Sequence, residues 1–72
     1  MPNKTRYDYS KLDYAIGEYI TGPKSERNRE ILRQYYLKGY SQAEIAGNVG
    51  MSEIQVGRII REDGNYVITK LK

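Results

Sequence analysis

The stretch SQAEIAGNVGMSEIQVGRIIRE, residues 41–62, decides the fold. It contains two S-x-x-E/Q patterns eleven residues apart, Ser41 with Glu44 and Ser52 with Gln55. In such a capping box the serine hydroxyl accepts a bond from a backbone N–H of the first helical turn, and the Glu or Gln side chain accepts one from the serine N–H. The patterns therefore predict that two helices begin at these serines, with a break at Gly50.

The residues between and after these serines have the spacing of a helix-turn-helix. Ala46 is small because the second helix crosses it closely, and Gly50 takes the tight turn, where a positive φ costs glycine little. Met51 fills the angle between the helices, while Val56 and Ile59 hold the second helix against the first. In this motif the second helix enters the major groove of DNA.

The outward face of this second helix carries the candidate base contacts. At about 100° per residue, it lies opposite the apolar side. Arg58 can bond guanine at two atoms, Gln55 can pair with adenine, Ile54 can touch a thymine methyl and Glu53 can accept from cytosine. Amides and hydroxyls at helix N-termini meet phosphates. The predicted DNA-binding residues are Ser41, Gln42, Ser52, Glu53, Ile54, Gln55, Gly57, Arg58 and Arg61.

Structural roles compete with these assignments. Gln55 is equally well explained as a capping partner, and Glu53 as an acidic group that stabilises a helix N-terminus. Arg58 can also be a solvated surface group. Gly57 costs about 1 kcal/mol of helix stability relative to alanine, and its missing side chain would let the helix sit closer to base edges. For Gly47, on the exposed side of the preceding helix, close approach by DNA or a partner protein is the one explanation.

Two further helices are expected before the motif. A pattern of apolar residues at helical spacing predicts one that begins with a capping box of Ser10 and Asp13 and ends at Gly22. The next begins at Ser25 as N-cap and ends at Gly39. The basic residues on its outer side form a solvated face or contact phosphates; they are Arg27, Arg29, Arg33 and Lys38.

The segment after the motif is predicted to leave the helical pattern. Residues 63–65, Asp-Gly-Asn, indicate a turn, and the β-branched residues of 66–71 favour a strand, with a frayed or helical tail as the alternative. The expected fold class is mainly α, with four short helices, a C-terminal helix-turn-helix and one short β-strand. The expected organisation is a flexible arm at 1–9, a helical domain at 10–62 with its motif at 41–61, and a turn and strand or dimerisation tail at 63–72.

Composition argues against catalysis. The 72 residues include no cysteine and no histidine, which excludes disulfides and thiolate zinc sites and removes the commonest catalytic side chains. We therefore expect no enzyme and no cofactor. No apolar run approaches the roughly 18 residues of a membrane span, and the N-terminus lacks the apolar region of a signal peptide. A cytoplasmic protein is expected.

Residues 29–62 resemble region 4 of bacterial sigma factors, especially alternative sigma factors of Gram-positive bacteria. The resemblance is carried by YSQAEIA, GMS and QVGRIIR. The helix-turn-helix domains of resolvases and phage regulators share the broader pattern. The resemblance implies a DNA-binding module, whereas what precedes residue 24 does not resemble the other sigma regions. A chain of 72 residues is expected to be too short for a complete sigma factor.

We expect sequence-specific binding to double-stranded DNA by a small transcriptional regulator of phage, plasmid or bacterial origin. A homodimer would cover two half-sites about 34 Å apart, with the C-terminal strand or the apolar face of the first helix as its interface. Two alternatives stay open. In the first, the chain is a module that docks on RNA polymerase or an anti-sigma-type partner. In the second, it is an accessory protein of DNA packaging or recombination.

Overall fold

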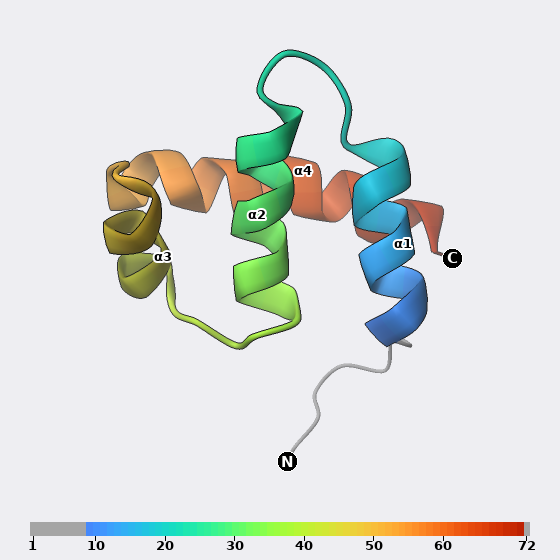
Figure 1. The fold of residues 1–72 in the computed structure, drawn as a ribbon, viewed down its shortest axis with the longest axis horizontal. Helices are drawn as coiled ribbons and strands as arrows, with labels where there is room; N and C mark the ends of the chain where they lie inside the picture. Colours follow the sequence, from blue (N-terminus) through green and yellow to red (C-terminus); the bar gives the residue numbers. More distant parts are fainter. Residues whose placement is uncertain (1–8, 72) are drawn as a thin grey trace.

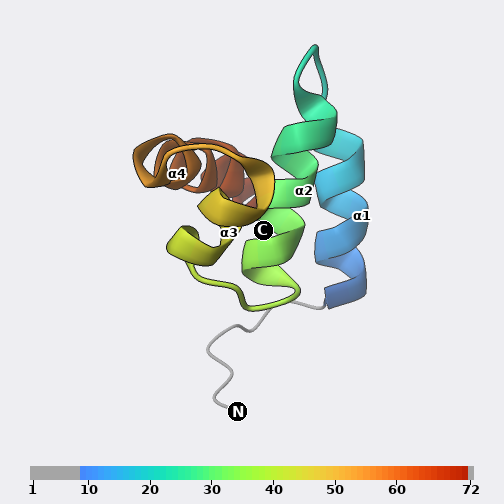
Figure 2. The ribbon, with the colours of Figure 1, turned by 60° about the vertical axis from the view of Figure 1, so that its left-hand side comes forward.

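Four helices make up most of the part of the chain that the computed structural model describes, residues 9–71. They are α1 (Tyr9–Tyr19), α2 (Ser25–Tyr36), α3 (Gln42–Val49) and α4 (Glu53–Lys70). Helices α1 and α2 lie side by side, α4 crosses both, and α3 packs at the end where α4 begins (Figure 1, Figure 2). The predicted mainly α class is confirmed. Of the predicted arm, residues 1–8 lie outside the described residues, and Tyr9 already belongs to α1.

One apolar core joins the four helices. Helices α2 and α4 each contact all three of the other helices, so these two together form the centre of the domain. The apolar side chains that are fully or nearly buried are Leu12, Ala15, Ile16, Ile20, Ile31, Leu32, Ile45, Ala46, Val56, Ile60 and Val67. Within the described range, no helix is long and apolar enough to cross a membrane.

The segment after the motif continues as a helix, so the predicted turn at 63–65 and strand at 66–71 are wrong. Helix α4 is uninterrupted over its 18 residues. Its buried positions, Val56, Ile60, Gly64 and Val67, recur every three or four residues, which is the period of a helix rather than of a strand. Burial against α1 and α2 therefore outweighs the weak strand preference of the β-branched side chains.

Both surfaces that the sequence suggested for a dimer are used in other ways. The apolar face of α1 is buried inside the monomer, where Leu12, Ala15 and Ile16 are each at most 1% exposed. The C-terminal tail is helical to Lys70, so its backbone groups bond within the helix and offer no strand edge. The tail therefore cannot pair as a strand, and the apolar face of α1 is covered by the monomer's own core.

Two helix starts also differ from the prediction. Helix α1 is already under way at Ser10, and the Asp13 carboxylate accepts a bond from Arg33 of α2. Helix α2 has Lys24 at its N-cap position with no side-chain cap, so Ser25 is its first helical residue. Helix α2 therefore starts without a side-chain cap, and the bond between Asp13 and Arg33 joins it to α1.

Asp63 of α4 lies against α2, where the Asn28 amide donates to its Oδ2 at 3.1 Å. Burial raises the pKa of the Asp63 carboxyl above its ordinary value, the bond from Asn28 lowers it in part, and the neighbouring charge of Glu62 raises it further. The folded chain therefore binds this proton more tightly than the unfolded chain does. Consequently the free energy of unfolding falls as pH rises through the raised pKa.

Asp63→Asn keeps an acceptor for Asn28 and removes the charge. We expect a higher thermal midpoint than wild type at pH 7, and no difference below about pH 3, where aspartate is protonated in both states. Circular dichroism melts between these pH values measure the difference. Glu62→Gln is the control: Glu62 is exposed and is the smallest of the three causes of the shift, so its removal should change the midpoint less. A variant that melts below wild type at pH 7 would contradict the assignment.

Candidate nucleic-acid interface

The turn between α3 and α4 has the geometry that the sequence predicts. Gly50 ends α3 with φ 70° and ψ 37°, in the left-handed region that favours glycine. Its N–H and that of Met51 both donate to the carbonyl oxygen of Ala46. Met51 is half-buried and packs against the core, so it fills the angle between the helices.

Both predicted capping boxes are present. Ser41 Oγ accepts from the Glu44 N–H at 3.1 Å, and Glu44 Oε1 accepts from the Ser41 N–H at 2.8 Å. Ser52 Oγ accepts from the Gln55 N–H at 3.1 Å, and Gln55 Oε1 accepts from the Ser52 N–H at 3.4 Å. The side-chain oxygen of Gln55 is thus engaged at the start of α4, as the capping explanation of this residue requires.

The first half of α4 has a buried side and a bare side. Val56 is fully buried and Ile60 is 8% exposed. On the other side Ile54 is 84% exposed, and Arg58 and Arg61 are exposed as well. A large aliphatic side chain in water contributes nothing to the packing of the monomer. This exposed side of α4 is therefore available for contact with a partner.

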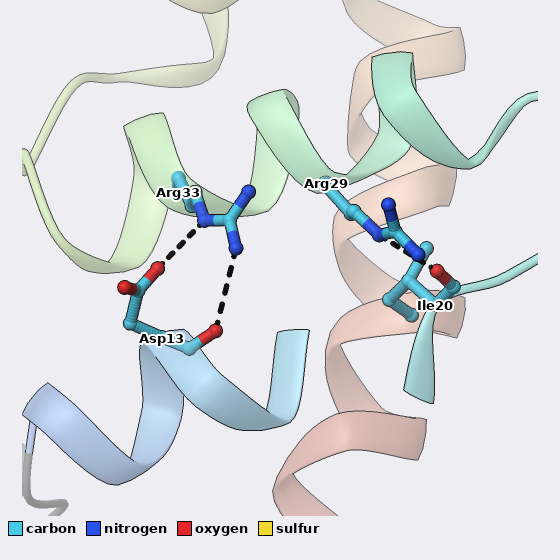
Figure 3. A network of polar contacts seen from close by, with 4 residues as sticks. All are labelled: Asp13, Ile20, Arg29 and Arg33. Carbon is cyan, nitrogen blue, oxygen red and sulfur yellow. Dashed lines mark hydrogen bonds and ion pairs between the residues drawn. The ribbon is translucent and has the colours of Figure 1, made fainter. Parts of the chain in front are cut away.

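The arginines of α2 serve the fold. Arg29 Nε donates to the carbonyl oxygen of Ile20 at 2.8 Å, just past the end of α1. Arg33 Nε pairs with Asp13 Oδ1 at 2.7 Å, and its Nη2 donates to the Asp13 carbonyl oxygen at 3.4 Å (Figure 3). These two arginines fasten α2 to α1, so for them the predicted solvated or phosphate-binding role is replaced by a structural one.

The arginines of α4 differ in this respect. Within residues 9–71, Arg58 and Arg61 make no hydrogen bond and no ion pair. Both side chains project from the exposed side of the second helix of the helix-turn-helix. These two positive charges therefore lie on the helix that enters the major groove in a helix-turn-helix.

The family described as Sigma-70, region 4, matches residues 25–62, from the first residue of α2 to Glu62 in α4. The chain belongs to this family. The resemblance seen in residues 29–62 is therefore confirmed and begins four residues earlier. Region 4 is a family of DNA-binding helix-turn-helix modules, not of enzymes. Neither a curated protein nor a solved structure matches the chain.

The nine predicted DNA-binding residues gather on one part of this region 4 domain: the start of α3, the turn and the first half of α4. Those with exposed positions are Ser41, Gln42, Ser52, Glu53, Ile54, Gln55, Arg58 and Arg61. The exception is Gly57, which is half-buried. Gly47 faces open space, because a Cβ built on it would meet no atom within 4 Å.

Gly57 is covered by a neighbouring side chain rather than open to solvent. Gln42, the first residue of α3, lays its amide over this glycine, and a Cβ built on Gly57 would lie 2.7 Å from Gln42 Nε2. The same Nε2 donates to the Glu53 carbonyl oxygen at 3.2 Å. The region 4 domain thus has a side-chain bridge between α3 and α4 that the sequence did not suggest.

A second bridge was also missed, between α2 and α3. Gln34 is buried at 7% exposure, although it carries a polar amide. Its Nε2 donates to Glu30 Oε2 at 2.9 Å, and its Oε1 accepts from Asn48 Nδ2 at 2.9 Å. The neighbouring Tyr35 is 39% exposed, although its ring is the larger apolar group. The one available signal was the position of Gln34 three residues after the apolar Ile31.

Proposed function

We propose that the chain binds double-stranded DNA in a sequence-specific manner by placing the first half of α4 in the major groove. The supporting observation is the contrast between the arginines. Those of α2 are engaged within the domain, whereas Arg58 and Arg61 are exposed beside Ile54 and have no partner within residues 9–71. Such a module fits a small transcriptional regulator of phage, plasmid or bacterial origin that acts in the cytoplasm.

In this proposal Arg58 bonds guanine through its two-pronged guanidinium, and Ile54 covers a thymine methyl. Glu53 selects cytosine or excludes other bases, and Arg61 adds a contact on the same face. The N-terminal ends of α3 and α4, with Ser41 and Ser52, approach phosphates. Gln55 is assigned to the cap of α4, since its oxygen bonds Ser52.

We propose that one module binds alone, because the structure supports neither of the two dimer surfaces expected from the sequence. The apolar face of α1 is buried, and the tail is part of α4. We therefore expect selection from a random duplex pool to enrich one short asymmetric site rather than two inverted half-sites about 34 Å apart. Enrichment of an inverted repeat would establish dimeric binding.

The test is equilibrium binding of the wild-type chain to random duplex DNA over a salt series. The proposal predicts weak binding that falls with salt, with a slope of about −0.9 for each phosphate contacted, and tighter binding to the selected site. A flat or absent response would overturn it. That result, combined with capture by RNA polymerase or an anti-sigma-type protein, would favour the protein-partner function.

A further inference from the structure

Gln42 is a predicted DNA contact whose side-chain amide already donates a hydrogen bond within the domain. Its side chain reaches from the first turn of α3 to the first turn of α4, where Nε2 donates to the Glu53 carbonyl oxygen at 3.2 Å. This hydrogen bond links the first turn of α4 directly to α3.

The bridge depends on Gly57. In an α-helix each Cα–Cβ bond leans toward the N-terminus, so a side chain at position 57 would stand over the turn that contains the carbonyl of Glu53. A Cβ there would lie 2.7 Å from Nε2 and 3.2 Å from Cδ of Gln42. Real Cβ atoms do not approach so closely, and the Gln42 amide would have to move away. Glycine at this position therefore keeps the carbonyl accessible to Gln42.

We infer that Gln42 is a positioning residue for the second helix, and that Gly57 is needed to admit its amide. By holding the first turn of α4, the bridge sets the position at which Glu53 and Ile54 meet base edges. This inference rests on the proposed DNA binding. It replaces two earlier roles, a phosphate contact for Gln42 and close approach of DNA for Gly57.

A phosphate contact and a positioning role make different predictions for sequence preference. Loss of a phosphate contact weakens binding to all sequences about equally. Loss of positioning weakens binding to the preferred site and leaves random duplex unchanged, because phosphate contacts tolerate a small displacement of the helix whereas base contacts do not. The ratio of the two affinities therefore separates positioning from a phosphate contact.

The experiment compares wild type, Gln42→Ala, Gly57→Ala and the double variant on the selected site and on random duplex. We expect each single variant to lower the affinity ratio by about threefold to tenfold, the effect of one hydrogen bond. The double variant should match Gln42→Ala, because both substitutions remove the same bridge and so are not additive. Thermal melts of the four proteins show that each is folded.

Each other outcome counts against the inference. If Gly57→Ala lowers the ratio as strongly in the Gln42→Ala background as in wild type, the glycine serves DNA approach and not the bridge. If Gln42→Ala weakens both duplexes equally, the residue is a phosphate contact. An unchanged ratio in both single variants also overturns the inference. Failure of wild type to bind any duplex is a separate result, which overturns the proposed function itself.

Discussion

Arg58→Ala is expected to weaken binding to the preferred duplex by about tenfold to a hundredfold, while the free energy of unfolding stays within about 0.5 kcal/mol of wild type. The free energy of unfolding should change little, because Arg58 is exposed and has no partner within residues 9–71. The affinity for the preferred duplex should fall strongly, because the guanidinium offers two parallel donors to one guanine. Competition binding with thermal melts of both proteins measures the two quantities.

Two control variants separate recognition from charge. Arg58→Lys keeps the charge but not the two-pronged donor, so binding to random duplex and its salt slope should remain while the preference is lost. Lys11→Ala removes one charge from α1, at the opposite end of the domain from α3 (Figure 1). Equal weakening by Lys11→Ala and Arg58→Ala would show that net charge, not base contact, explains the binding.

The local geometry of the interface was predictable because short-range rules govern it. A capping box joins residues three apart, and Gly50 is needed because its own backbone has a positive φ. The contact of Gln42 with Gly57 was not predictable in this way. It depends on how α3 crosses α4, and nothing in the sequence pairs the two residues. The bond from Arg29 to the end of α1 belongs to the same class.

In the fold, too, features set by neighbouring residues were predictable, and features set by packing between helices were not. The helix of residues 53–62 was predicted from its cap and its apolar period, but its continuation was not. The Asp-Gly-Asn sequence at 63–65 is typical of a turn when the chain is exposed. Here Gly64 is buried, and the Tyr36 ring of α2 lies against it. A glycine at a close helix crossing and a glycine in a turn look alike until the partner helix is known.

Gly64→Leu is therefore expected to lower the free energy of unfolding by about 2–3 kcal/mol, the cost of overpacking a core. For a chain of this size the thermal midpoint should fall by about 10–20 °C. The physical reason is space: a Cβ on Gly64 would lie 2.7 Å from Tyr36 Oη and 3.3 Å from its Cε2. A leucine would force α2 and α4 apart. Circular dichroism melts at one protein concentration measure the shift.

The matched control is Gly47→Leu, the same substitution at a helical glycine with open space around it. It should leave the midpoint unchanged or raise it, because leucine stabilises a helix relative to glycine by roughly 1 kcal/mol. Tyr36→Phe removes the nearest atom, so Gly64→Ala should be better tolerated in that background than in wild type. If Gly64→Leu had the same thermal midpoint as Gly47→Leu, α2 would not cross α4 at residue 64. That result would favour the predicted turn at 63–65 over a continuous α4.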